Sequence, residues 1–227
     1  KSYYCSMKNA LKNTIPQPAA VDICATPVVQ PASQLRGRYR SPLRYPGGKQ
    51  KAIDPIAARL PESAKGFKEF REPLIGGGSV YLHARTINFA KKYWVNDKFK
   101  ELVSFWTAVQ DPETCARLMK DLEKLRAKFK SSEEIKKYFL KAREEQPDDE
   151  YREAFLFFFF NRVTFSGTTR AGGFSSSASL RRFTASSIER LAPLPEAFEN
   201  TKITNLDFED VIKAPGNDVF IFLVSPY

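Results

Sequence analysis

The stretch Glu72-Pro73-Leu74-Ile75-Gly76-Gly77-Gly78-Ser79-Val80 decides the fold. A short predicted strand from Gly66 to Leu74 leads into three consecutive glycines, and a helical pattern begins at Ser79. Glycine accepts positive φ and has no Cβ, so a turn of this kind lets the backbone approach a ligand closely. The free N–H groups of a following helix suit a polar cofactor. A flexible loop is the alternative interpretation of a Gly-rich turn that stands alone.

Three further predicted strands complete an α/β sheet: Tyr93 to Val95, Lys202 to Leu206 and Asp218 to Leu223. The last is apolar throughout, as a strand buried on both faces should be. Asp97 follows the first of them, about 20 residues beyond the glycines, where a nucleotide-binding fold places the acid that holds the ribose hydroxyls. The alternative role for an Asp after a strand is a helix N-cap.

Helical spacing covers most of the remaining chain. We expect helices over residues 50–60, 79–88, 98–110 and 151–160, with two more between 111 and 142. Asp111-Pro112-Glu113 is a helix start signal, and Ser131 or Ser132 caps the next helix.

Composition limits the class of protein. The chain has 227 residues, of which 42% are hydrophobic, and no apolar run approaches the roughly 20 residues that span a bilayer. The cysteines Cys5, Cys24 and Cys115 are too few for a disulfide framework and lack metal-ligand spacing, which indicates reduced thiols in a cytoplasmic protein without a metal site. The only histidine, His83, is expected to pack or to lie on the surface.

The formal net charge of +10 favours a polyanionic partner. Residues 161–190 contain five arginines and a single acid, Glu189, among glycines and hydroxyl side chains. We expect a hairpin or extended loop from Asn161 to Ser175 that enters a DNA groove, with Arg and Asn at base edges and Ser or Thr at phosphates. An ordinary surface loop is the alternative.

These pieces, in this order, resemble the Dam-type (D12 class) DNA adenine-N6 methyltransferases. Tyr45-Pro46-Gly47-Gly48-Lys49 resembles the amino-terminal motif of that family for S-adenosyl-L-methionine, and Glu72 to Ser79 resembles its glycine motif, with Leu74 where Phe is usual. Asn96-Asp97 resembles the ribose-holding acid. Phe159-Phe160-Asn161-Arg162, with Phe165 and Gly167, resembles the start of the DNA-reading hairpin, and Asp207-Phe208 resembles the pair at the cofactor adenine.

The resemblance implies a Rossmann-like sheet with a helical and hairpin target-recognition insertion, double-stranded DNA as partner and a monomeric, site-specific enzyme. Its role, in restriction-modification or as a phage or housekeeping methylase, stays open. The implied cofactor-binding residues are Tyr45, Gly47, Lys49, Pro73, Gly76, Gly77, Gly78, Ser79, Asp97, Asp207 and Phe208. The implied DNA-binding residues are Asn161, Arg162, Thr164, Ser166, Arg170, Arg181 and Arg182. The target adenine would leave the duplex and enter a pocket beside the methyl group.

The catalytic motif departs from the family pattern. The family has Asp-Pro-Pro-Tyr after the fourth strand, whereas this chain has Val224-Ser225-Pro226-Tyr227, with Lys49 as the further catalytic candidate. Valine cannot accept the hydrogens of adenine N6, and losing one such partner costs on the order of 10²–10³ in rate. The family also has further strands after this motif, so we expect a C-terminally truncated sheet and a chain that is weakly active or inactive and marginally stable.

The expected organisation has four parts. Residues 1–40 are a disordered basic tail, 41–110 the cofactor-binding part, 111–200 the helical and hairpin DNA target-recognition region, and 201–227 the continued catalytic domain. Three alternatives stay open: an inactive remnant that binds DNA or the cofactor, an RNA methyltransferase, and a nicotinamide-dependent oxidoreductase. The last predicts Gly-x-Gly-x-x-Gly spacing, which the clustered glycines do not supply.

Overall fold

The structure is a computed structural model that describes residues 3–5, 38–61 and 66–224. Its strands form one sheet in the order β1-β5-β2-β3-β4, and every pair is parallel. The strands are β1 (Tyr3–Cys5), β2 (Phe67–Glu72), β3 (Ala90–Asn96), β4 (Thr201–Thr204) and β5 (Val219–Phe222). The prediction of an α/β chain with a parallel, Rossmann-like sheet is confirmed.

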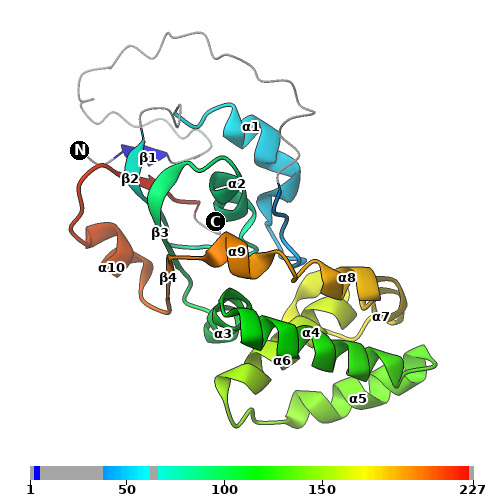
Figure 1. The fold of residues 1–227 in the computed structure, drawn as a ribbon. Helices are drawn as coiled ribbons and strands as arrows, with labels where there is room; N and C mark the ends of the chain where they lie inside the picture. The colour runs from blue at the N-terminus through cyan, green and yellow to red at the C-terminus, as the bar shows by residue number, and fades with distance from the viewer. Residues whose placement is uncertain (1–2, 6–37, 62–65, 225–227) are drawn as a thin grey trace, which may run out of the picture.

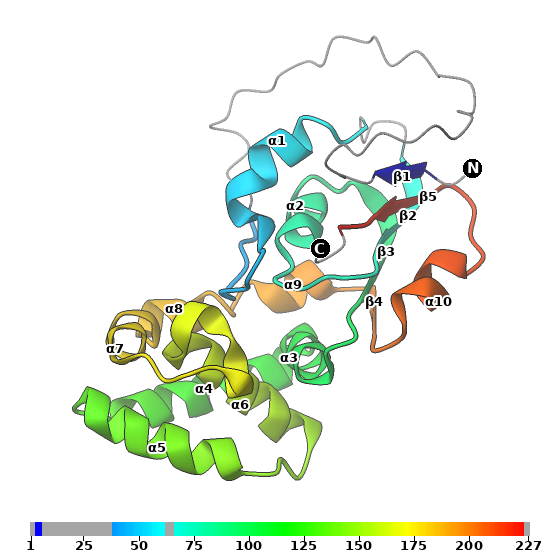
Figure 2. The same ribbon diagram turned by 180° about the vertical axis from the view of Figure 1, so that it is seen from behind.

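Helices lie on both faces of this sheet. Figures 1 and 2 show α2 and α10 on opposite sides of β2 and β3, with α1 beyond α2. These helices are α1 (Ile53–Ala57), α2 (Ser79–Thr86), α9 (Leu194–Phe198) and α10 (Phe208–Lys213), and a 3-10 turn, η1 (Lys49–Ala52), leads into α1. Since both faces are covered, all four residues of β5 are buried, as its unbroken apolar sequence predicted.

A lobe of helices lies beside the sheet (Figure 1). It contains α3 (Lys100–Gln110), α4 (Pro112–Ala127), α5 (Ser132–Glu144), α6 (Glu150–Val163), α7 (Ser176–Arg182) and α8 (Ala185–Glu189). All six residues from Phe155 to Phe160 on α6 are buried, because α6 packs against α3, α4 and α7 at once. A helix that is apolar all round needs neighbours on every side, and the lobe supplies them.

The predicted start signals of the lobe are confirmed. Asp111 Oδ1 accepts the backbone N–H of Thr114 at 2.8 Å, and Pro112 is the first residue of α4. Ser131, rather than Ser132, caps α5 by accepting the backbone N–H of Glu134. Such caps satisfy backbone donors that have no partner inside the helix.

The structure differs from the sequence-based expectation at two places. Tyr3–Cys5 and Tyr39 both fall in the expected disordered tail, yet Tyr3–Cys5 is a strand paired with β5 and Tyr39 is buried. Residues 6–37 of the expected tail lie outside the described part. The expected hairpin after Phe160 is a compact loop, because α6 continues to Val163. Two short 3-10 turns, η3 (Phe165–Gly167) and η4 (Thr169–Ala171), follow, and one antiparallel bridge between Thr164 and Phe174 closes the loop.

Within the described ranges no helix is long and apolar enough to cross a membrane. The same residues contain no group of three or more His, Cys, Asp or Glu side chains that would hold a metal ion. His83 is buried in α2, where burial lowers the pKa of its imidazole and favours a neutral packing role.

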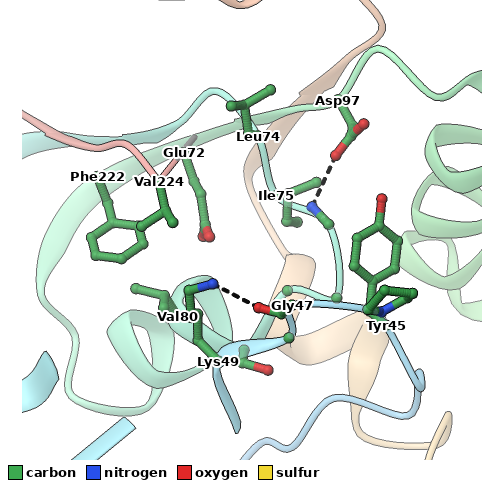
Figure 3. Close-up of a pocket in the computed structure, with 16 residues that line it drawn as sticks. Tyr45, Gly47, Lys49, Glu72, Leu74, Ile75, Val80, Asp97, Phe222 and Val224 are labelled. Carbon is green, nitrogen blue, oxygen red and sulfur yellow. Dashed lines mark hydrogen bonds between the residues drawn. The ribbon is translucent and has the colours of Figure 1, made fainter. Parts of the chain in front are cut away.

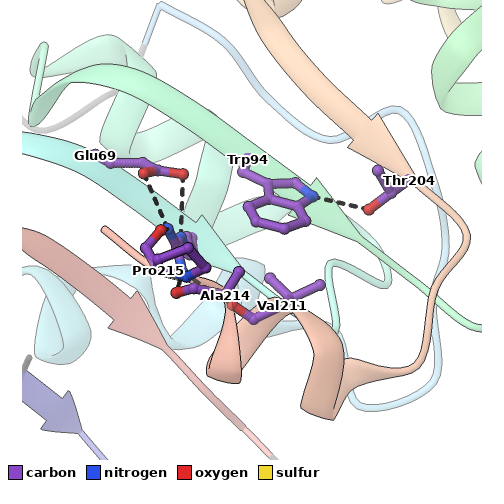
Figure 4. Close-up of polar contacts among 7 residues, drawn as sticks. Glu69, Trp94, Thr204, Val211, Ala214 and Pro215 are labelled. Atoms are coloured by element: carbon purple, nitrogen blue, oxygen red, sulfur yellow. Dashed lines mark hydrogen bonds and ion pairs between the residues drawn. The ribbon is translucent and has the colours of Figure 1, made fainter. Parts of the chain in front are cut away.

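Arg71 fixes α10 to the face of the sheet opposite α2. Its side chain is 2% exposed and donates to the backbone oxygens of Val211, Ala214 and Pro215 at 3.1, 2.7 and 2.8 Å (Figure 4). It also pairs with Glu69 and lies over the Trp94 ring, 5.1 Å from the ring centroid. The guanidinium therefore satisfies one carbonyl in the last turn of α10 and the two carbonyls that directly follow the helix.

We expect the Arg71→Met variant to lose about 3 kcal/mol of unfolding free energy, because three backbone carbonyls and the Glu69 carboxylate lose their partner. Urea denaturation followed by circular dichroism measures the loss. The matched control is Lys91→Met, at an exposed position on β3, which should leave the midpoint nearly unchanged. Equal stability of the two variants would contradict this role of Arg71.

Candidate active site

A cavity of about 200 Å³ opens at the carboxyl ends of the strands. Figure 3 shows that residues distant in sequence surround it. It is lined by Tyr45, Pro46, Gly47, Gly48, Lys49, Glu72, Leu74, Ile75, Gly76, Gly77, Gly78, Ser79, Val80, Asp97, Phe222 and Val224. The turn Tyr45–Lys49 (the basic turn), the turn Gly76–Gly78 (the glycine turn) and Asp97 after β3 thus converge in one place, at the edge where parallel α/β sheets bind ligands.

Aromatic rings pack directly on the glycine turn. A Cβ on Gly76 or Gly77 would lie 2.9 Å from the Tyr45 side chain, and a Cβ on Gly78 would lie 3.0 Å from Trp106. Trp106 Nε1 also donates to the Gly76 carbonyl at 3.1 Å. Gly78 has a φ of 69°, a conformation that favours glycine. Glycine is required here as much by the rings behind the turn as by the backbone angle.

The Asn96 side chain joins the ends of three strands. Its Nδ2 donates to the carbonyls of Pro73, after β2, and Leu206, after β4. Its Oδ1 accepts the Leu206 N–H at 2.8 Å and the Thr204 hydroxyl at 2.7 Å. All the hydrogen-bonding capacity of the amide is used, so these strand ends have one arrangement.

Asp97 is not the N-cap of α3, which is Phe99, but its side chain accepts two backbone hydrogen bonds at the end of β3. Its Oδ1 accepts the Phe99 N–H at the entrance to α3, and its Oδ2 accepts the Gly76 N–H at 2.9 Å. Burial raises the pKa of this carboxyl, and the backbone hydrogen bonds oppose the rise. A carboxylate has about four lone-pair positions, so Asp97 can still accept hydrogen bonds from a ligand in the cavity.

Glu72 lines the cavity, although the sequence assigned it no role. Its side chain is 4% exposed, and Oε2 has no hydrogen-bond partner. Burial raises the pKa of this carboxyl well above its usual value, while a backbone hydrogen bond from Tyr81 acts in the opposite direction. Figure 3 shows the carboxyl group pointing into the cavity. The signal in the sequence was an acid at the end of the predicted strand, directly before the glycine turn.

The basic turn is attached to the helical lobe. Asn161, on α6, accepts the Arg44 N–H at 3.0 Å and donates to the Arg44 carbonyl at 2.6 Å. The next residue, Tyr45, lines the cavity, and burial beside Asp97 raises the pKa of its phenol to about 12, so the hydroxyl stays protonated. Lys49 Nζ donates to the Gly47 carbonyl at 2.7 Å, which closes the turn.

Comparison with known proteins decides what this arrangement belongs to. The family model of the D12 class N6 adenine-specific DNA methyltransferases matches residues 45–227. The chain belongs to this family. It is also similar to the Type II methyltransferase M.MjaIII of Methanocaldococcus jannaschii, with 26% identity over 200 residues that cover 82% of this chain and 68% of that protein. Enzymes of the D12 class use S-adenosylmethionine to methylate adenine N6 in DNA.

The position that the family resemblance predicts to be catalytic follows the end of β5 in this D12 methyltransferase. Phe222 and Val224 line the cavity, and Val224 packs against the core (Figure 3). The structure therefore places an apolar side chain where the family pattern has an acid. Residues 225–227, the rest of the catalytic motif, lie outside the described part.

The structure places three of the expected cofactor-binding residues outside the cavity lining. Pro73 is buried next to the cavity, where its carbonyl accepts a hydrogen bond from Asn96. Asp207 and Phe208 are exposed at the start of α10, where Asp207 accepts the Glu209 N–H. The methyltransferase keeps them near Asp97 through Asn205, whose Nδ2 donates to the Asp97 carbonyl at 2.8 Å.

The expected DNA-binding residues differ in burial: three are buried, three are exposed and one is partly buried. Asn161, Arg162 and Thr164 are buried with partners inside the protein, which corrects their expected place on a DNA-facing hairpin. They are buried because α6 runs on through Val163 and its last turn packs against the segment from Pro42 to Arg44. Ser166, Arg181 and Arg182 are exposed. Arg170 is partly buried, and its Nη1 donates to the Arg143 and Glu145 carbonyls.

We expect the Gly77→Ala variant to bind S-adenosylmethionine about tenfold more weakly, because its Cβ would meet Tyr45 Cβ at 2.9 Å and push the basic turn away from the cavity. Isothermal titration calorimetry measures the affinity. In the control variant Gly173→Ala the new Cβ meets only Phe165, at an ordinary 3.6 Å, and cofactor binding should not change. A Gly77→Ala variant that binds like the control would show that Tyr45 does not shape the site.

Proposed function

We propose that this chain binds S-adenosylmethionine and double-stranded DNA as an adenine-N6 methyltransferase, and that Val224 makes its own turnover slow. The observation that carries the proposal is the meeting of the basic turn, the glycine turn and Asp97 around one cavity. We further propose that it works as a monomer in the cytoplasm. Gel filtration coupled to light scattering tests the oligomeric state.

The cavity suits a cofactor with one cationic end and one hydroxyl-bearing part. S-adenosylmethionine supplies a methyl group on a positively charged sulfur, and it carries an ammonium group and a ribose. The free Oε2 of Glu72 is a buried acceptor in need of a cationic donor, so we assign it to the ammonium group. Asp97 is assigned to the ribose hydroxyls. Asp207 and Phe208, beyond Asp97, are assigned to the adenine ring.

Methyl transfer requires acceptors for the hydrogens of the target amine. Adenine N6 is a weak nucleophile because its lone pair is delocalised into the ring, and an acid at the catalytic position draws that lone pair toward the methyl group. The Val224 side chain has no lone pair to accept these hydrogens. This observation supports a second candidate function, a protein that binds DNA and the cofactor with little or no turnover.

The DNA side of the proposal uses the exposed residues of the lobe. Ser166, Arg181 and Arg182 are assigned to contacts with the duplex. The buried side chains of Asn161 and Arg162 are assigned a structural role, since their hydrogen bonds hold the neighbouring segments in place. The adenine must leave the base stack to reach the cavity, since the cavity lies within the fold.

We expect cofactor affinity to fall as the pH drops through the raised pKa of Glu72, because only the carboxylate attracts the ammonium group. Below that pKa the affinity should fall about tenfold per pH unit, and above it the affinity should be constant. The isosteric variant Glu72→Gln should bind weakly with a flat pH profile. Calorimetry at several pH values measures both, and parallel profiles for the two proteins would remove Glu72 from the binding site.

We expect the Val224→Asp variant to transfer methyl groups to duplex DNA about 10²–10³ times faster than the unaltered chain, because it restores an acceptor for the N6 hydrogens. Transfer of labelled methyl groups measures the rate, and Val224→Leu is the apolar control, expected to stay slow. If the unaltered chain is already as fast as Val224→Asp, the second candidate function is excluded and Val224 does not limit turnover. If all three bind DNA and the cofactor but none turns over, the second candidate function stands.

A further inference from the structure

Four arginines from separate segments lie close enough to interact electrostatically with Arg162 at their centre. Arg44 immediately precedes the basic turn, Arg162 lies on the last turn of α6, Arg182 ends α7, and Arg190 follows α8. We call these four residues the arginine cluster. Its members come from positions up to 146 residues apart in sequence, so the fold, and not local sequence, brings them together.

Arg162 is the buried base of the cluster. It is 5% exposed, and it donates from Nη1 to the Pro42 carbonyl at 2.7 Å and from Nε to the Arg182 carbonyl at 3.0 Å. These two bonds tie the segment before the basic turn to the end of α7. Arg44 is half-buried above it, and Arg182 and Arg190 are exposed.

The members of the cluster repel one another. The positive charges of Arg190, Arg44 and Arg182 add to burial in lowering the pKa of Arg162 to about 10. Burial and Arg182 likewise hold the pKa of Arg44 below its usual range. No acid opposes these effects at either residue, and none of the ion pairs formed within the described ranges includes a member of the cluster.

A polyatomic anion matches this arrangement. Guanidinium groups bind phosphate through paired N–H donors, and several of them around one anion convert mutual repulsion into attraction. The exposed members give access from solvent, and Arg162 gives a rigid base. The cluster also lies next to the loop that holds Ser166, because a Cβ on Gly167 would come within 2.1 Å of the Arg44 carbonyl.

We propose that Arg44, Arg182 and Arg190 bind one backbone phosphate of duplex DNA, with Arg162 as the positioning residue beneath them. This inference rests on the proposed function for its source of phosphate. It adds Arg44 and Arg190 to the DNA side of the protein. Because Arg44 directly precedes the basic turn, this contact would also position the duplex relative to the cofactor cavity.

The test compares the variants Arg182→Gln and Arg190→Gln with Lys91→Gln, an exposed position at the amino end of β3, away from the cavity. Affinity for a fluorescent non-target duplex is measured over a series of salt concentrations. Each cluster variant should bind about tenfold more weakly at low salt. The plot of log affinity against log salt should lose about 0.9 of its slope per variant if the phosphate contact is lost. Lys91→Gln should match the unaltered chain.

A second measurement does not depend on DNA. Inorganic phosphate should raise the melting temperature of the unaltered chain and of Lys91→Gln more than that of either cluster variant, because only the intact cluster binds it. Unchanged salt slopes and unchanged phosphate responses would overturn the proposal. Loss of the phosphate response with no change in DNA binding would overturn the assignment to DNA. If the unaltered chain binds no duplex at all, the proposed function fails, and the phosphate response alone decides whether the cluster is an anion site.

Discussion

The hydrogen bonds of the Asn96 side chain hold the active site together. They connect the segments after β2 and β4 to the end of β3, and Asn96 is completely buried. The backbone continues this connection, since the Asn96 carbonyl accepts the Ile75 N–H at 2.9 Å. Both the glycine turn and Asp97 take their positions from this joint. An amide is suited to the task because it donates and accepts at once without carrying a charge into the core.

Two consecutive residues of β2, Arg71 and Glu72, are both buried and charged, but they have different roles. Arg71 and Glu72 point to opposite faces of the sheet, as successive strand residues must. The Arg71 guanidinium has partners on every side, and it fastens α10. The Glu72 carboxyl has an oxygen without a partner, and it faces the cavity. A buried charged group whose hydrogen bonds are all made within the protein has a structural role. A buried charged group with an unpaired atom that faces a cavity is a candidate for ligand binding.

Much of this arrangement was predictable from local signals. The parallel sheet, the helix starts at Asp111 and Ser131, and the meeting of three motifs at the strand ends follow from patterns within short windows. The positions of Asn161 and Arg162 did not, because the pattern of the loop after Phe160 gave no sign that α6 would run on and bury them against Pro42 and Arg44. The orphaned oxygen of Glu72 and the arginine cluster were equally hidden, since each depends on which distant segments pack together.

The attachment of the basic turn to Asn161 has a consequence for how the protein folds. The two residues that form it, Arg44 and Asn161, are 117 positions apart, and contacts between such distant residues form slowly during folding. The basic turn, which makes one wall of the cavity, is therefore placed only when this contact forms. The sheet and the lobe can each gain most of their own contacts before that wall is in place. Cofactor affinity should therefore appear late during refolding, after the helical signal has already returned, and its return marks the moment when the two halves of the molecule first dock.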